Sequence, residues 1–142
     1  MSTFLRLNAV ALLFALMTGI PALSELNFYR ILRLTEWEPG TLVTAGFIFN
    51  SVWIGGLSVI GYRLLRRWFG LKPVRFAAAL LWIPYYFLLL RAFGALFPLA
   101  DAGDLPNPAS GLILLFGISV TPFWIVFLCA VGGTSADREG DR

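Results

Sequence analysis

The chain has 142 residues, 58% of them hydrophobic and only 13% charged, and its mean hydropathy is +0.80. This apolar content is well above that of a soluble domain and predicts an integral membrane protein. The 11 basic and 8 acidic residues leave a small positive charge. No long basic stripe or recognition module accompanies that charge, so nucleic acid is not an expected partner.

Helices of roughly 20 apolar residues cross a bilayer core of about 30 Å. The chain has four apolar runs near that length, at residues 7–23, 41–62, 76–98 and 110–131. They are apolar on every side, whereas the strands of a membrane barrel alternate apolar and polar residues. We therefore expect an all-α polytopic membrane protein, with one transmembrane four-helix bundle over residues 1–132 and a disordered cytoplasmic tail at 133–142.

The first run allows two interpretations. It is broken near its end by Gly19 and Pro21 and is followed by the letters ALS before Glu25. That pattern also fits a signal peptide with a cleavage site of the A-x-S type. The length of the run favours a retained helix, and three spans would remain if it were cleaved.

Basic and acidic residues are separated between the loops on either side of the third run. The loop before the third run is basic, and the loop after it carries Asp101 and Asp104 without a base. The positive-inside rule places the basic loop and both termini in the cytoplasm and the acidic loop outside. We expect a multi-pass protein of a bacterial inner membrane. The five basic residues of the cytoplasmic loop are Arg63, Arg66, Arg67, Lys72 and Arg75.

These five residues surround Trp68 and Phe69 in the segment YRLLRRWFGLKPVRF. Basic clusters next to a membrane attract anionic lipid by about 1 kcal/mol per charge. Two interpretations stay open: the cluster only sets the topology, or it is also a contact site for anionic lipid or a partner. Membrane lipids are expected partners, and another membrane protein or a second copy of the chain are further candidates.

The segment ELNFYRILRLTEWEPG, residues 25–40, is too polar to cross the bilayer. Phe28, Ile31 and Leu32 fall on one helical face, opposite Tyr29 and Arg33. The pattern predicts an amphipathic helix at the outer interface or, equally, an ordered loop that closes the outer end of the bundle.

Small and helix-bending residues mark the later spans. Ser51, Gly55 and Ser58 share one face of the second span, where another helix of the same chain is expected to approach closely. Pro84 and Pro122 each remove a main-chain hydrogen bond and predict bends in the third and fourth spans.

The fourth span begins after the turn LPNPASG, in which Ser110 is the expected helix cap. Within the span, Cys129 is the one cysteine of the chain, so no disulfide or redox-active thiol pair is available. We expect it to be a small packing residue.

The inventory of reactive groups is small. Without histidine, the chain offers no His-ligated haem or zinc, no Ser-His pair and no His proton relay. No Asp or Glu lies within a span to act as a general acid or base or to carry a coupled proton. We therefore expect no enzyme activity, no catalytic residues, no metal and no cofactor.

Arg91 is the one charged residue within an expected span. An arginine in mid-membrane costs roughly 2.5 to 3.5 kcal/mol, so it has to be paired or to reach the headgroups. Small residues share its helix face, so we expect Arg91 to point into the bundle at the depth of Asn50. There it is either a clamp between helices or the centre of an outward-facing polar pocket for an anionic small molecule or lipid. The other candidate residues of this site are Asn50, Glu25, Tyr85, Tyr86, Asp101 and Asp104.

Trp37, Asn50 within FIFNSVWIGG, and the segment RRWFGLKPVRF together resemble a family of small four-span bacterial inner-membrane proteins of unknown function. An acidic residue expected shortly before the asparagine is absent here. The resemblance implies a four-helix architecture and no particular activity. We expect an accessory or assembly subunit that acts through its membrane faces. The alternative is a binding or transport protein with a pocket centred on Arg91.

Overall fold

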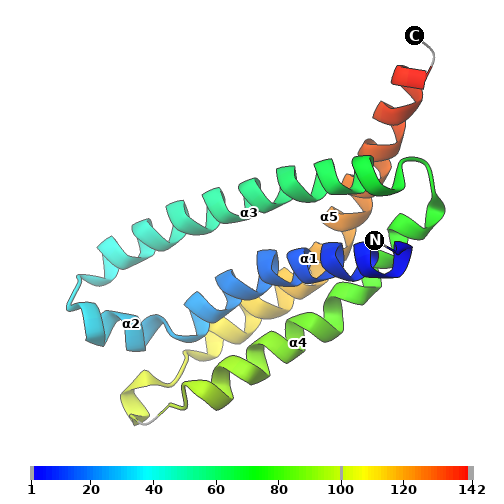
Figure 1. Ribbon diagram of the computed structural model, residues 1–142. Coiled ribbons are helices and arrows are strands. Elements are labelled where there is room, and N and C mark those ends of the chain that lie inside the picture. The colour runs from blue at the N-terminus through cyan, green and yellow to red at the C-terminus, as the bar shows by residue number, and fades with distance from the viewer. Residues whose placement is uncertain (1, 100, 141–142) are drawn as a thin grey trace.

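The computed structural model describes residues 2–99 and 101–140, with side chains up to residue 132. The described chain is helical and without strands: α1 (Thr3–Leu26), α2 (Phe28–Thr35), α3 (Pro39–Phe69), η1 (Pro73–Ala77), α4 (Ala78–Leu96), η2 (Ala102–Asp104) and α5 (Pro108–Gly140). Four segments are long and apolar enough to cross a membrane, at Thr3–Leu26, Pro39–Phe69, Pro73–Leu96 and Pro108–Gly132. The predicted all-α, multi-pass bundle is confirmed (Figure 1).

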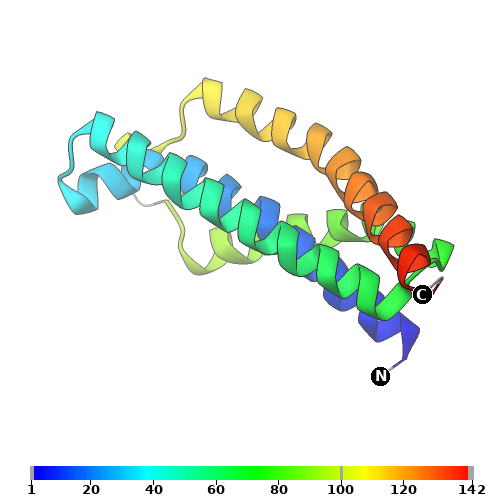
Figure 2. The same ribbon diagram turned by 90° about the horizontal axis from the view of Figure 1, so that it is seen from above.

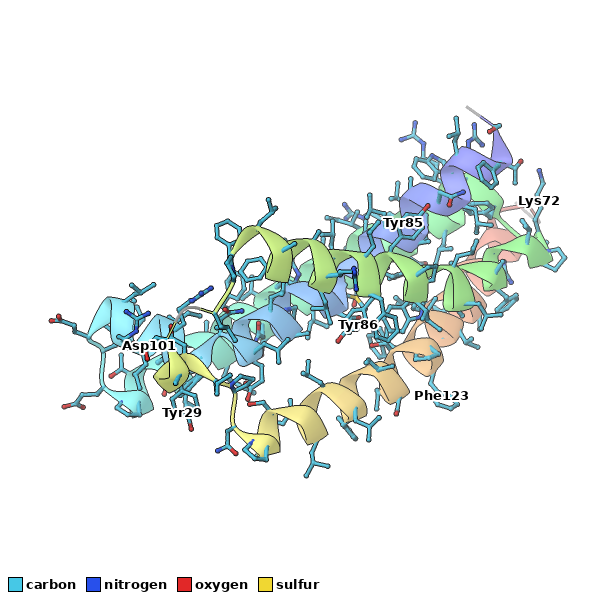
Figure 3. All side chains as sticks on the ribbon, turned by 90° about the horizontal axis from the view of Figure 1, so that it is seen from below. Tyr29, Lys72, Tyr85, Tyr86, Asp101 and Phe123 are labelled. Carbon is cyan, nitrogen blue, oxygen red and sulfur yellow. The ribbon has the colours of Figure 1, made fainter. Side chains whose placement is uncertain are left out.

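The two ends of the bundle differ in the segments they contain. The start of α1 and the C-terminal part of α5 lie near the turn between α3 and η1, which we term the hairpin end (Figure 1). The opposite end holds α2 and η2, and we term it the loop end. In Figure 3, Lys72 lies at the hairpin end, and Tyr29 and Asp101 lie at the loop end. Of the tail expected at residues 133–142, the structure describes the backbone of residues 133–140, as the end of α5, without their side chains. Residues 141–142 lie outside the described part. The disorder of the tail stays a prediction.

Local sequence explains where the helices begin and end. Pro108 is the first residue of α5, where its missing N–H costs no helical bond. Asn107 Oδ1 accepts a hydrogen bond from the Ala109 N–H at 3.0 Å. Asn107, rather than the predicted Ser110, is therefore the capping residue. At the hairpin end, Gly70 ends α3 with a φ of 50°, a left-handed conformation that favours glycine.

α1 is the central helix of the bundle. It contacts α3, α4 and α5, and half of its most apolar stretch is buried. No charge interrupts this stretch, and small residues alternate with large ones, which lets three helices pack around it. Its buried residues are Leu7, Val10, Ala11, Phe14, Ala15, Met17, Gly19, Ala22 and Leu23. The folded bundle therefore depends on α1.

The crossing of α1 and α3 relies on a glycine. A Cβ atom at Gly61 would lie 2.8 Å from Phe14 Cε1, so this ring packs directly on the backbone of α3. Ser58, one turn away, is also buried. The close approach predicted for this helix occurs at Ser58 and Gly61, whereas Ser51 and Gly55 of the predicted face are exposed. The contact thus lies nearer the hairpin end than the sequence pattern indicated.

Two smaller expectations are confirmed. The predicted amphipathic helix is present as α2, and Tyr29 and Arg33 are on its exposed side. Cys129 is fully buried, and its thiol donates to the Arg75 carbonyl oxygen at 3.4 Å, so it packs α5 against η1.

The Phe14 contact generates a test of the central packing. Phe14→Ala leaves a cavity at a fully buried ring and should lower the free energy of unfolding by about 3 kcal/mol. The matched control is Phe123→Ala, because the Phe123 side chain is 77% exposed and points away from the bundle (Figure 3). Unfolding in mixed micelles, followed by circular dichroism, measures both. Equal losses for the two variants would contradict the central position of α1.

Candidate functional site

A groove of about 430 Å³ lies between α3 and α5 in the half of the bundle nearer the loop end. Residues 17–25 of α1 form its base, together with Tyr86 of α4. Asn50 and Ile54 of α3 form one wall, and residues 113–124 of α5 form the other. Four helices therefore enclose one mainly apolar space.

The course of α5 opens this groove. Pro122 lies inside the helix and has no N–H to donate to the Ile118 carbonyl oxygen. In Figure 2, α5 is curved: its first half lies away from α3, and its second half approaches α3 toward the hairpin end. Phe116 and Val120 of α5 and Ile54 of α3 border the space and are exposed. The mouth of the groove is therefore apolar and opens to the side of the bundle.

Hydrogen-bonded side chains close the groove toward the hairpin end. The hydroxyl oxygens of Thr18 and Thr121 lie 3.2 Å apart, which joins α1 to α5. The Trp124 indole N–H donates to Ser58 Oγ at 2.9 Å, which joins α5 to α3. Bonds between side chains of different helices hold membrane bundles together where the hydrophobic effect does not. The groove therefore ends toward the hairpin end at a weakly polar surface, which we term its floor.

Two hydrogen-bond acceptors lie at the opposite part of the groove. Glu25 Oε1 accepts a bond from Ser110 Oγ at 3.1 Å. Asn50 Oδ1 is buried and has no hydrogen-bond partner among the described residues. Met17 of α1 contacts Ser58 of α3. Glu25 lies eight residues from Met17 toward the loop end, and Asn50 lies eight residues from Ser58 in the same direction. Both acceptors are therefore at a similar level along the bundle. An unpaired buried acceptor costs about 1 to 3 kcal/mol, which a bound donor would recover.

The two tyrosines of the predicted site, Tyr85 and Tyr86, point to different parts of the bundle. Tyr86 is buried, packs edge-to-face on Trp82 at 5.5 Å between ring centroids, and lines the groove. The Tyr85 hydroxyl donates to Asn8 Oδ1 at 2.5 Å and does not line the groove. Neighbouring residues point about 100° apart on a helix, and here the Tyr85 side chain turns toward Asn8 of α1 instead of the groove. Tyr86 therefore lines the groove and Tyr85 does not, and the role of either in a binding site stays a prediction.

Arg91 does not face the bundle, so the prediction that it is a buried clamp or the centre of the pocket is wrong. It is exposed on α4 and has no hydrogen bond or ion pair with the described residues. The buried face of α4 follows Ala78, Trp82 and Tyr86, and Arg91 lies far around the helix from that line. The small residues beside it, Gly94 among them, are exposed as well.

The acidic residues predicted beside Arg91 pair instead with α2. Arg33 makes a two-pronged contact with Asp104, from Nε to Oδ1 at 2.9 Å and from Nη2 to Oδ2 at 2.7 Å. Arg30 Nε lies 3.7 Å from Asp104 Oδ2, and Arg33 Nε lies 3.9 Å from Asp101 Oδ2. We term these four residues the loop-end clamp. It joins the α1–α3 connection to the α4–α5 connection.

The loop-end clamp also covers the C-terminal end of α4 and shifts the pKa of Asp104. The Arg30 guanidinium donates to the carbonyl oxygens of Phe97 and Pro98, where α4 ends. Hydrogen bonds from Arg33 are the main cause that lowers the pKa of Asp104 below the usual value of an aspartate. The same bonds raise the pKa of Arg33. The pair is therefore charged at neutral pH.

The five basic residues of the hairpin end are not one uniform surface. Arg63, Arg67 and Lys72 are exposed, and Arg66 is half-buried. Arg75 is buried: its guanidinium donates to the Gly70 carbonyl oxygen and lies over the Phe76 ring, 5.1 Å from the centroid. The expectation that Arg75 contacts lipid or a partner is wrong because η1 folds its side chain under the turn.

Comparisons with known proteins add no relative. No family model matches the sequence, and no curated protein and no solved structure gives a significant match. The resemblance to small four-span bacterial inner-membrane proteins therefore stays a prediction. Among the described residues, no group of three His, Cys, Asp or Glu side chains is placed to hold a metal ion. The groove is the site on which a function can be argued.

The clamp predicts a pH-dependent stability. Because the pKa of Asp104 is lowered in the fold, ionised Asp104 stabilises the protein above its unfolded pKa of about 4. That stability is lost as the pH falls through the lower, folded pKa. Asp104→Asn should therefore lower the thermal midpoint at pH 7 and flatten its decline in acid. Asp101→Asn is the control, because the Asp101 side chain is 55% exposed and its contact is longer. A larger effect from Asp101→Asn would contradict this assignment.

Proposed function

We propose that the chain is a membrane-embedded binding protein that takes an amphipathic molecule sideways from the bilayer into the groove between α3 and α5. The groove itself carries this proposal, since its volume of about 430 Å³ lies within the range of small-molecule sites. Its mouth is bordered by the exposed apolar side chains of Ile54, Phe116 and Val120. An apolar chain can therefore enter from lipid without crossing water.

Charge distribution supports an orientation for this binding protein. Arg63, Arg67 and Lys72 are exposed at the hairpin end, and Asp101 and Asp104 belong to the loop end. With the basic end in the cytoplasm, the groove lies in the outer half of the membrane. We propose that the ligand comes from the outer leaflet of a bacterial inner membrane, with both termini of the chain in the cytoplasm.

The groups around the groove favour binding over catalysis. Glu25 is the one charged side chain among the described lining residues, and its hydrogen-bonded neighbour is Ser110. Acid–base or nucleophilic catalysis needs a second reactive group within hydrogen-bond reach, such as a histidine, a thiol or another carboxylate. Glu25 and Asn50 can instead orient the polar head of a ligand.

Filling the groove tests this function. Gly117 lines the groove, and a Cβ atom there would meet nothing within 4 Å, so Gly117→Leu should fold and occupy the binding space. The control is Gly111→Leu on the same helix, where a Cβ atom also meets nothing within 4 Å; Gly111 is exposed and does not line the groove. Both changes raise helix propensity alike.

The readout is photolabelling in liposomes with a long-chain alcohol that carries a diazirine. Wild type and Gly111→Leu should be labelled in the α1 segment 17–23 at Met17 and Ala22, which are buried and line the groove. With the probe well below its Kd, Gly117→Leu should lose about 90% of that label, as expected for a tenfold loss of affinity. Absence of label on this segment in the wild type would refute the binding function.

A second candidate function is an accessory or assembly subunit, and Arg91 is the observation that favours it. Its exposed position lies five residues before the end of α4, on the order of 7 Å inside the helix end. A charge at the lipid face needs an anionic partner or a path to the headgroups. A carboxylate on the helix of another protein would be such an anionic partner, and the exposed Gly94 would let that helix approach.

Arg91→Gln tests the assembly role. If Arg91 holds a partner, the wild type should migrate as a complex on native gels after mild solubilisation, and Arg91→Gln should migrate as the free subunit. Arg63→Gln is the control, because Arg63 is an exposed arginine at the other end of the bundle. Identical migration of the wild type and Arg91→Gln would reject the assembly role for this face.

A further inference from the structure

We infer that the ligand of the groove is a single-chain amphipath with a cationic, hydrogen-bond-donating head, such as a long-chain primary amine. This inference rests on the proposed binding function and names the class of its ligand. It follows from which polar atoms line the groove, where they lie along it, and which charges are missing from it.

Two acceptor oxygens near the loop end of the groove have no donor among the described residues. Asn50 Oδ1 is buried without a partner among the described residues. Glu25 receives one hydrogen bond, from Ser110 to Oε1, and no described residue donates to its second carboxylate oxygen. Glu25 and Asn50 both line the groove, one on α1 and the other on α3. An ammonium group has three N–H donors, so a cationic head supplies the donors that these two acceptors lack.

The charge of the lining selects a cation. Glu25 lines the groove, and no arginine or lysine does. Arg91, the expected cation of the pocket, faces the other way, and Arg30 and Arg33 are held in the loop-end clamp. An anionic head would be placed beside a carboxylate in surroundings that screen charge poorly. The anionic ligand expected from the sequence therefore does not fit this space.

The rest of the groove fits an aliphatic chain. Between the acceptors and the floor at Thr18 and Thr121, the walls are apolar and include Ile54, Ile113 and Val120. A chain lying along α1 would bury its surface there, with its far end near the floor or out through the mouth. The head then lies nearer the loop end, which is also the nearer surface of the bilayer, so the amphipath keeps the direction it has in lipid.

Competition against the photolabelling alcohol tests the ligand class. Unlabelled competitors of equal chain length carry an amine, a hydroxyl, a trimethylammonium or a carboxylate head. Each is compared at equal bilayer concentration in zwitterionic liposomes. The amine should compete best, about tenfold more strongly than the carboxylate, because a charge-assisted hydrogen bond is gained in one case and repulsion in the other. The trimethylammonium head, which has no N–H donor, should be weaker than the amine.

Two substitutions assign the effect to the acceptors. Glu25→Gln should remove most of the advantage of the amine over the alcohol, and Asn50→Leu should weaken both. Asn50→Leu should also fold at least as well as the wild type, since it removes an unpaired buried acceptor. The matched controls are Glu38→Gln and Ser51→Leu, at exposed positions that do not line the groove, and they should leave the order of competitors unchanged.

The outcomes separate this inference from the function on which it rests. Loss of labelling in the wild type would reject the binding function as a whole. Labelling in which the carboxylate competes as well as the amine would keep the binding function and overturn the cationic head. An amine advantage that persists in Glu25→Gln would overturn the role of this carboxylate.

Discussion

The structure depends on where α1 and its neighbours come into close contact. In lipid, apolar surface alone does not drive helices together, so small residues and side-chain hydrogen bonds decide which parts touch. In this chain such contacts gather toward the hairpin end: Phe14 packs on Gly61, and Trp124 is bonded to Ser58. The half of α3 nearer the loop end is mostly exposed. The space between α3 and α5 follows from this uneven distribution of contacts.

The two halves of the bundle are held by different forces. Packing and uncharged hydrogen bonds hold the hairpin half. In the loop half α1 also packs on α4, at Gly19 and Leu89, but α2 and the start of α5 are held by the ion pairs of the loop-end clamp and by the bond from Ser110 to Glu25. The clamp fixes the connections outside the apolar helices and leaves the groove between them unfilled. A protein that has to admit a chain from lipid needs this combination, because a fully packed bundle would have no room.

Much of the fold could be predicted from the sequence, because a run of apolar residues without charge has one stable arrangement in lipid, the helix. The site was predicted less well, since the choice of which helix face is buried is made by the partner helices. Arg91 lies beside small residues, but α4 packs through Trp82 and Tyr86, so that face stays outside. Asn50 and Glu25 were identified by depth, which is a property of one helix and its direction. Thr18 was missed because a threonine in an apolar run gives no signal by itself.

Pro122 gives α5 a pivot. The part of α5 between Pro108 and this residue forms an arm about 20 Å long, which ends at the bond between Ser110 and Glu25. A rotation of roughly 10° about the pivot would move the far end of the arm by roughly 3 to 4 Å, about the width of an aliphatic chain. The single hydrogen bond from Ser110 to Glu25 at the far end of the arm would then control the width of the whole groove.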